Sequence, residues 1–269
     1  MTQETTAGSL DRVRHTYEEL GKQDPFWAVL TDDKKRGNKW DSHEFFETGR
    51  SEIEGLMEQL HSMGLSLGRE RALDFGCGVG RLSQALCSYF ECVVGVDISR
   101  TMIEKAEQLN QYPSRCTYVT NTQDDLSTFN NDAFDLVYSN ITLQHMPPRH
   151  SLKYIGEFIR VLKPDGLAVF HVPDGPDYTT SWWRHRWYTL RREYMRPLWK
   201  QVRGRPPVQI HYVPQKKVEG IITASKGTLL HTLEMRPGRG HIRTMWYFAI
   251  RVGCCEIRKQ RGRAYKKDE

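Results

Sequence analysis

The sequence predicts an α/β fold, a doubly wound and mostly parallel sheet with helices on both faces. From Glu70 onward, short apolar runs alternate with segments of helical periodicity. The runs are apolar at successive positions, as in strands that helices cover on both faces. The last two runs are separated only by PGRGHI, which predicts an antiparallel hairpin at the sheet edge.

The expected elements follow in order along the chain. Residues 1–24 are polar and predict a frayed or loosely helical segment, whereas apolar residues from Ser51 onward recur at helical spacing until Gly64. Strands are then expected at RALDF, CVVGVD, CTYVT, FDLVYSN and GLAVFHV, with helices at VGRLSQALCSYF, RTMIEKAEQLN and SLKYIGEFIRVLKP. A last helix is expected at VPQKKVEGIITASKG, followed by strands at TLLHTLEMR and RTMWYFAIRV.

This order predicts five segments. A helical N-terminal cap over residues 1–68 precedes a Rossmann-like core over residues 69–173. A basic, aromatic insertion at 174–213 follows the fifth strand. Residues 214–255 complete the core with a helix and antiparallel strands, and residues 256–269 form a basic tail.

Composition limits the class of protein. The chain is 38% hydrophobic and has seven tryptophans, which favours a globular protein. It has no apolar stretch long enough to cross a bilayer, and its first residues are polar, unlike a signal peptide. The six cysteines form no CxxC pair and no metal-ligand spacing. We therefore expect a reduced, cytoplasmic protein without a metal site.

Charge is unevenly distributed along the chain. Residues 1–180 hold 18 Lys and Arg against 27 Asp and Glu, whereas residues 181–269 hold 21 against 6. A basic C-terminal third favours an anionic partner or substrate, such as a phosphate, a carboxylate, nucleic acid or a membrane surface. The alternative is a solvated basic face followed by a tail.

A glycine-rich turn follows the first strand, in the stretch ALDFGCGVGR. Gly76, Gly78 and Gly80 permit a tight strand-to-helix turn and the close approach of a ligand to the backbone. The second strand ends in Asp97, whose carboxylate can accept hydrogen bonds from both ribose hydroxyls of an adenosine. A dinucleotide, a nucleotide phosphate and S-adenosylmethionine (SAM) are the candidate ligands.

Three details favour SAM. The spacing is G-x-G-x-G rather than the G-x-G-x-x-G of dinucleotide-binding proteins, and no GK[ST] follows to hold a phosphate. Asp74 stands two residues before Gly76, where a carboxylate would repel a pyrophosphate and attract an ammonium. SAM carries an ammonium group and no phosphate.

The stretch ALDFGCGVGR, followed by VVGVDIS, FDLVYSNITLQHM and VLKPDGLAVF, resembles class I SAM-dependent methyltransferases of the broad type 11 small-molecule group. The likeness covers residues 70–172, with four motifs in the family's order. It implies a Rossmann-like methyltransferase whose last two strands form an antiparallel edge. It also implies SAM as the cofactor.

The resemblance implies roles for individual residues. Asp74 would hold the amino group of the methionine moiety, and Asp97 would take the ribose hydroxyls. The family's aspartate after strand three has no unambiguous counterpart in NTQDDL, where alignment places Thr122 or Asp124. The remaining implied contacts are the glycine turn with Cys77, Ile98 against the adenine, Gln123 and Asp124 near its amino group, the backbone of Asn140, and Trp40 and Phe46 shielding the sulfonium.

The sequence says less about the molecule that accepts the methyl group. His145 lies just past strand four and is a candidate general base or acceptor-orienting group, with a structural histidine as the alternative. Residues 181–206 hold eight basic residues and one acidic residue among aromatics, of which Trp183, Arg184 and Trp187 are candidate substrate contacts.

Several functions fit this insertion. It fits a lid over a small or lipid-linked anionic acceptor, a membrane-surface helix, an RNA-binding segment, or a helix packed on the sheet. The sequence therefore predicts SAM-dependent methyl transfer to a small or lipid-like acceptor by in-line displacement. The alternatives are an RNA methyltransferase and a non-catalytic SAM-binding regulatory protein.

Overall fold

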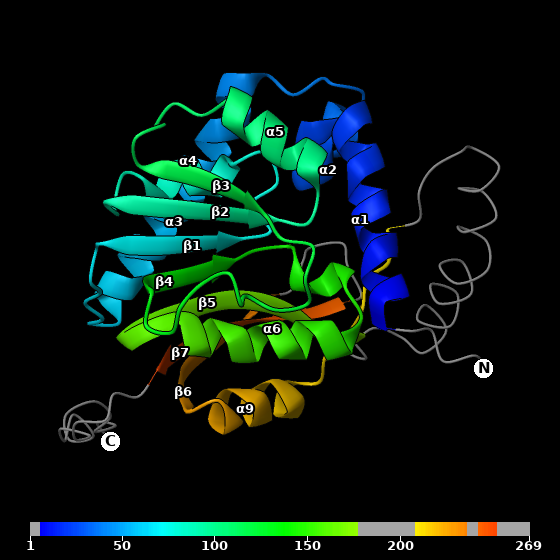
Figure 1. The fold of residues 1–269 in the computed structure, drawn as a ribbon. Helices are drawn as coiled ribbons and strands as arrows, with labels where there is room; N and C mark the ends of the chain where they lie inside the picture. Colours follow the sequence, from blue (N-terminus) through cyan, green and yellow to red (C-terminus); the bar gives the residue numbers. More distant parts are fainter. Residues whose placement is uncertain (1–5, 177–207, 236–241, 252–269) are drawn as a thin grey trace, which may run out of the picture.

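The computed structural model describes residues 6–176, 208–235 and 242–251, which form a seven-stranded sheet with helices packed on it (Figure 1). The strand order is β3-β2-β1-β4-β5-β7-β6. The first five strands are parallel, and β7 is antiparallel to both β5 and β6. The predicted fold class and the terminal hairpin are confirmed.

The strands are β1 (Arg71–Phe75), β2 (Cys92–Asp97), β3 (Cys116–Thr120), β4 (Phe134–Ser139), β5 (Leu162–Pro176), β6 (Gly227–Met235) and β7 (Ile242–Arg251). The helices are α1 (Thr6–Gln23), α2 (Pro25–Val29), α3 (Ser42–Ser62), α4 (Arg81–Leu86), α5 (Arg100–Gln108), α6 (Pro148–Val161) and α9 (Gln215–Ala224), with short 3-10 turns η1 (Asp33–Lys35) and η2 (Leu143–His145).

Two helices differ from the sequence prediction. Helix α3 begins at Ser42 rather than near Ser51, because the Asp41 side chain accepts a hydrogen bond from the Glu44 amide and caps the helix. Residues 6–23 form a regular helix, where the sequence predicted a frayed or loosely helical segment. Packing against the rest of the protein stabilises this polar sequence, and Leu10 and Leu20 are both buried.

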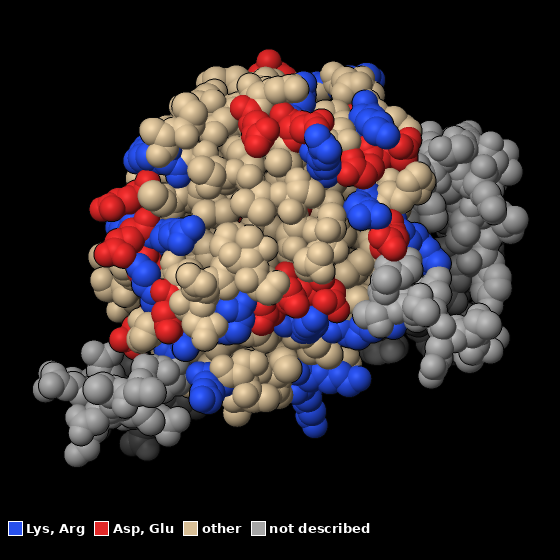
Figure 2. All heavy atoms as spheres, viewed as in Figure 1, with Lys and Arg blue, Asp and Glu red and all other residues tan. Residues whose placement is uncertain are grey.

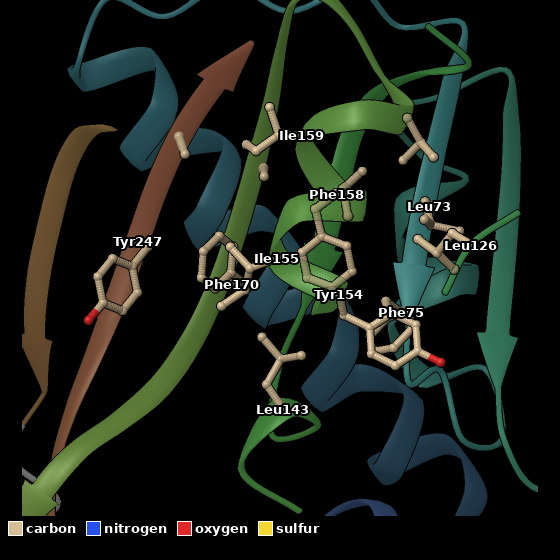
Figure 3. Close-up of a cluster of buried hydrophobic side chains, with 14 of the residues drawn as sticks. Leu73, Phe75, Leu126, Leu143, Tyr154, Ile155, Phe158, Ile159, Phe170 and Tyr247 are labelled. Atoms are coloured by element: carbon tan, nitrogen blue, oxygen red, sulfur yellow. The ribbon is translucent and has the colours of Figure 1, made fainter. Parts of the chain in front are cut away.

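The sheet separates two apolar layers. On one face, α6 and α9 pack on the strands, and Figure 3 shows Phe75, Tyr154 and Phe158 pointing toward one another between β1 and α6. The rings of Phe75 and Tyr154 lie 4.5 Å apart. On the other face, α3 and α4 cover β1 and its neighbours. The central strands β1, β2 and β4 are buried along most of their length, which explains why their sequences are largely apolar.

Helix α1 crosses the carboxyl ends of the parallel strands (Figure 1). Glu18 accepts hydrogen bonds from the backbone amides of Arg100 and Thr101 at the start of α5, at 2.7 and 3.1 Å. Near the other end of α1, Ser9 Oγ lies 2.9 Å from His150 Nε2 on α6. These contacts hold α1 over the edge of the sheet where ligands bind in open α/β folds.

The charged surface offers no single strong patch in the view of Figure 2, which shows acidic and basic side chains interspersed around a central uncharged area. Within the described ranges, no helix combines the length and apolar character needed to cross a membrane. The division of the chain into a cap, a core, an insertion and a tail stays a prediction.

Candidate functional site

The loop from β1 to α4 is shaped by glycines in the left-handed region. Gly76, Gly78 and Gly80 have φ values of +80°, +54° and +85°. A Cβ added to Gly76 would lie 2.1 Å from Thr142 Oγ1, and one added to Gly78 would lie 2.3 Å from a Val29 methyl group. The loop therefore passes directly against β4's carboxyl end and α2, with no room for side chains.

Asp97 closes this loop from β2. Its Oδ2 accepts a hydrogen bond from the Gly78 amide at 2.9 Å, and its Oδ1 accepts one from the Ser99 amide at 2.9 Å. Burial raises the pKa of the carboxyl to about 6, although both amides favour the charged form. At neutral pH, Asp97 therefore presents a largely ionised carboxylate beside the glycine loop.

A cavity opens beside Asp97 at the carboxyl ends of the parallel strands. Its floor is the carboxyl edge of the sheet, and α1 and α2 cover it with apolar side chains. The lining residues are Leu10, Val13, Tyr17, Ala28, Val29, Phe75, Gly76, Gly78, Val96, Asp97, Ile98, Met102, Asn121, Ile141, Thr142, His145, Met146 and Tyr154.

The covering face of α1 follows from helical spacing. Leu10, Val13 and Tyr17 lie three and four residues apart, so they share one side of the helix, and all three line the cavity. Burial, with the negative charge of Asp97 as a smaller contribution, raises the pKa of Tyr17 well above its ordinary range. Tyr17 is therefore a neutral hydroxyl at physiological pH.

Asp74 lies beneath the glycine loop, on the side of the sheet that α4 covers. It is 1% exposed, its Oδ2 accepts a hydrogen bond from Ser83 Oγ at 2.6 Å, and its Oδ1 has no partner. Burial raises its pKa to about 7, and the Ser83 hydrogen bond and the nearby Arg81 charge oppose that rise. A buried carboxylate oxygen without a partner is unusual in a folded protein and indicates a place for a donor.

The loop after β3 is held by Asn121. Its side-chain amide donates to the Asp125 carbonyl at 2.7 Å, and its Oδ1 accepts from the Gln123 amide at 3.1 Å. The Tyr154 hydroxyl donates to the Gln123 carbonyl at 2.5 Å. Asp124 accepts from Lys153 Nζ at 2.6 Å. Asn121 and Tyr154 line the cavity, whereas Gln123 and Asp124 belong to the loop behind them.

The turn after β4 is strained. Ile141 has a φ of +58°, which is rare for a β-branched residue, and its side chain lines the cavity. The Ile141 amide donates to His171 Nδ1 on β5 at 3.0 Å. His171 is buried, and burial lowers its pKa to about 4. A neutral imidazole on the neighbouring strand therefore fixes this turn.

His145 forms part of the cavity wall, next to Tyr17. Their ring centroids are 5.7 Å apart. His145 Nδ1 lies 3.1 Å from the Gln209 carbonyl, which can only accept, so Nδ1 carries the proton. Nε2 then accepts from the Gln144 side-chain amide at 3.1 Å. Burial lowers the His145 pKa to about 4, so the ring is neutral and both nitrogens have partners.

The structure brings together some of the residues singled out from the sequence. Gly76, Gly78, Asp97, Ile98 and His145 line the cavity. Asp74, Cys77, Gly80 and Asn140 lie in the loop or strand ends around it but do not line it. Trp40 and Phe46 pack in an aromatic cluster behind α2 with Phe26 and Phe45. Trp183, Arg184 and Trp187 lie outside the described residues.

Other lining residues were missed by sequence reasoning. Tyr17 and Val29 lie in segments that carry no recognisable motif, and their role depends on how α1 and α2 fold over the sheet. Asn121, directly after β3, and Thr142, in the turn after β4, could have been found, because polar residues at these places reach the same carboxyl edge as Asp97. The signal for both was their position soon after a strand.

Comparison with known proteins agrees with this geometry. Residues 72–166 match a protein family described as a methyltransferase domain. The chain contains a class I SAM-dependent methyltransferase domain. The chain is 34% identical over 133 residues to thiocyanate methyltransferase 1 of Brassica oleracea, an alignment covering 47% of this chain and 58% of the relative.

Two further relatives show the breadth of the resemblance. Cyclopropane-fatty-acyl-phospholipid synthase of Escherichia coli is 35% identical over 107 residues, covering 38% of this chain and 25% of the relative. A crystal structure of magnesium protoporphyrin IX methyltransferase from Synechocystis, with bound S-adenosylhomocysteine, superposes with a TM-score of 0.61 at 18% identity. That superposition covers 91% of this chain and all of the other, and shows the shared fold. The chain spans less than two thirds of each of these two curated relatives.

Proposed function

We propose that the methyltransferase domain binds SAM in this cavity and transfers its methyl group to a small-molecule acceptor. The position and setting of Asp97 carry the proposal. Among the described lining residues it is the sole charged carboxylate, and no lysine or arginine accompanies it. A site for a dinucleotide or nucleotide phosphate would need positively charged side chains there, whereas SAM itself carries positive charge on its sulfonium and ammonium groups.

The residues present fit SAM. Asp97 has two carboxylate oxygens beside the glycine loop, which suits the two hydroxyls of a ribose. Val96, Ile98 and Met102 form an apolar wall next to it, which suits a purine ring. The unpartnered Oδ1 of Asp74 lies under the same loop, where it favours an ammonium group. SAM supplies, when bound, a sulfonium-linked methyl group for in-line displacement.

The protein's own contribution is to orient the reactants and exclude water. The apolar side chains of α1 and α2 keep bulk water from the cavity, which protects a charged donor and strengthens electrostatic contacts inside. The strained turn at Ile141 and the glycine loop both border the cavity, which supports a preorganised site.

We assign the acceptor to the end of the cavity formed by Tyr17, Ile141, His145 and Met146. These side chains give a mostly apolar surface with one hydroxyl, which fits a small organic or lipid-like molecule. His145 supports a shaping role better than that of a base, because its pKa is low and both nitrogens are engaged. The basic insertion remains our candidate for recognising an anionic part of the acceptor.

The proposal is tested by methyl transfer from radiolabelled SAM to an acceptor panel. The panel includes small anions, carboxylates, phenols, lipid-linked sugars and RNA. Product with at least one small acceptor, lost in Asp97→Ala, is the expected result. SAM binding without product throughout would favour the non-catalytic regulatory alternative. Product with RNA alone, weakening steeply as salt rises, would favour the nucleic-acid alternative.

A further inference from the structure

The carboxylate of Glu52 on α3 joins segments on two sides of the glycine loop. Its Oε2 accepts a hydrogen bond from Arg81 Nη2 at 2.7 Å. Its Oε1 accepts from the Tyr138 hydroxyl at 2.8 Å and from the Asn140 side-chain amide at 2.6 Å. Arg81 directly follows the loop, and Asn140 directly follows β4. Both carboxylate oxygens are therefore used to hold the ends of two different strand–loop units.

This arrangement is largely removed from water. The Arg81 side chain is 3% exposed and that of Glu52 is 25% exposed. Gly49, one turn before Glu52, permits the approach: a Cβ there would lie 2.5 Å from the Arg81 carbonyl oxygen. Helix α3 thus lies directly against the start of α4. Such close packing limits the ways in which Arg81 can move.

The strand order indicates which part of SAM lies nearest the cluster of Glu52 with Arg81, Tyr138 and Asn140. Strands β2, β1 and β4 are adjacent in that order, and Asp97 ends β2. If Asp97 takes the ribose, a ligand running across the strand ends places its other half over the Gly76 side of the loop and the end of β4. That half is the amino-acid end of SAM. Thr142, which donates to the Asn140 carbonyl at 3.0 Å, lines the cavity there.

The charge of the cluster points the same way. Arg81 pairs with Glu52 at 2.7 Å, and the negative charge of Glu52 contributes to the raised pKa of Asp74. Asp74 Oδ1 has no hydrogen-bond partner among the described residues. An ammonium group arriving at this side of the loop would supply that partner.

We propose that Glu52 is a positioning residue for the amino-acid end of SAM. It acts through Arg81, which follows the glycine loop, and Asn140, which follows β4, and does not itself touch the ligand. The inference rests on the proposed function, because it assumes that SAM occupies the cavity. It adds a role for α3, which carries no recognised methyltransferase motif.

Two ligands separate this role from a general structural one. S-adenosylhomocysteine has the amino-acid end, whereas 5′-methylthioadenosine keeps the adenosine and sulfur but lacks it. We expect Glu52→Gln to weaken S-adenosylhomocysteine binding on the order of tenfold, the effect of losing one hydrogen bond between charged groups. Binding of 5′-methylthioadenosine stays within about twofold of wild type, which also shows that the variant is folded.

Glu54→Gln is the matched control. Glu54 lies on the same helix two residues later and is exposed, so this variant should bind both ligands as the wild type does. Arg81→Gln should reproduce the ligand-selective loss. Calorimetric titration of the full chain with each ligand measures all four proteins.

The outcomes are distinguishable. If the wild type binds neither ligand, the proposed function and this inference both fail. If the wild type binds both and Glu52→Gln loses affinity for both equally, or for neither, the SAM site stands and the positioning role is overturned. A selective loss for the ligand with an amino-acid end, absent in Glu54→Gln, supports the role.

Discussion

Replacing Gly76 with alanine tests whether the glycine loop must lie where the structure places it. At a φ of +80°, an L-residue is disfavoured by about 1–2 kcal/mol. The new Cβ would lie 2.1 Å from Thr142 Oγ1 and 2.3 Å from its Cγ2, so the Thr142 side chain must shift. Overpacking of this kind destabilises by about 1–3 kcal/mol.

The two effects together lower the free energy of unfolding by about 2–5 kcal/mol. For a domain of this size, that corresponds to a thermal midpoint roughly 4–20 °C lower. Because domains are typically stable by about 5–15 kcal/mol, most of the variant stays folded at 25 °C. Thr142 lines the cavity, so S-adenosylhomocysteine affinity should also fall.

Thermal melting followed by calorimetry at 25 °C measures both effects. Gly55→Ala is the control, since Gly55 lies in α3 with no atom near its added Cβ, and helix propensity predicts stabilisation by about 0.5–1 kcal/mol. The two alanine substitutions should therefore shift the midpoint in opposite directions. A Gly76→Ala variant as stable as wild type, with unchanged affinity, would refute the loop geometry.

Three further predictions concern buried polar groups. Burial raises the Asp74 pKa to about 7, so ionisation of this carboxyl destabilises the fold progressively from the ordinary aspartate pKa of about 4 up to pH 7, and fully above pH 7. Asp74→Asn should therefore raise the melting midpoint more at pH 8 than at pH 5, and equal shifts would contradict this. Because the His145 pKa is about 4, the pH profiles of kcat for wild type and His145→Gln should have the same shape between pH 6 and 8. If kcat of the wild type instead depended on a group titrating near pH 6.5, and this dependence were lost in the variant, His145 would be the general base. His171→Leu leaves the Ile141 amide without its hydrogen-bond acceptor and should lower the free energy of unfolding by about 1–3 kcal/mol, measured by urea unfolding. His171→Asn keeps an acceptor and should recover part of this stability. Equal stability of the two variants would count against the prediction.

The pH dependence of stability combines opposing contributions. The lowered pKa values of His145 and His171 mean that the unfolded chain binds protons below about pH 6.5 while the folded chain does not. Their contribution to stability is therefore full above that pH and is lost as pH falls toward 4. Asp74 and Asp97 act in the opposite direction, because their folded pKa values are raised.

The fold was accessible from the sequence because its signals are local. Continuous apolar runs after Glu70, the turn at Gly76 and the short PGRGHI link specify strands and connections without knowledge of distant contacts. Helix α1 was underestimated for the opposite reason. Its sequence is polar, and its order comes from Leu10 packing on the core and from Glu18 capping α5.

The site was accessible only in part. Asp97 and the glycines could be recognised in the sequence, because the ligand needs those residue types at that spacing. Tyr17 gives no such signal, because it reaches the cavity through tertiary packing of a helix that precedes the motifs. Asn121 is a different case. Its position directly after β3 was informative, but its residue type differs from the aspartate that the family resemblance implies after the third strand.

Calorimetric titration with S-adenosylhomocysteine tests the central claim most directly. The wild-type chain should bind one equivalent, and Asp97→Ala should weaken binding by at least about tenfold, because a charged acceptor of ribose hydrogen bonds is removed. The thermal midpoint of the wild type should rise with ligand concentration. No binding by the wild type, or undiminished binding by Asp97→Ala, would contradict the assignment of this cavity to SAM.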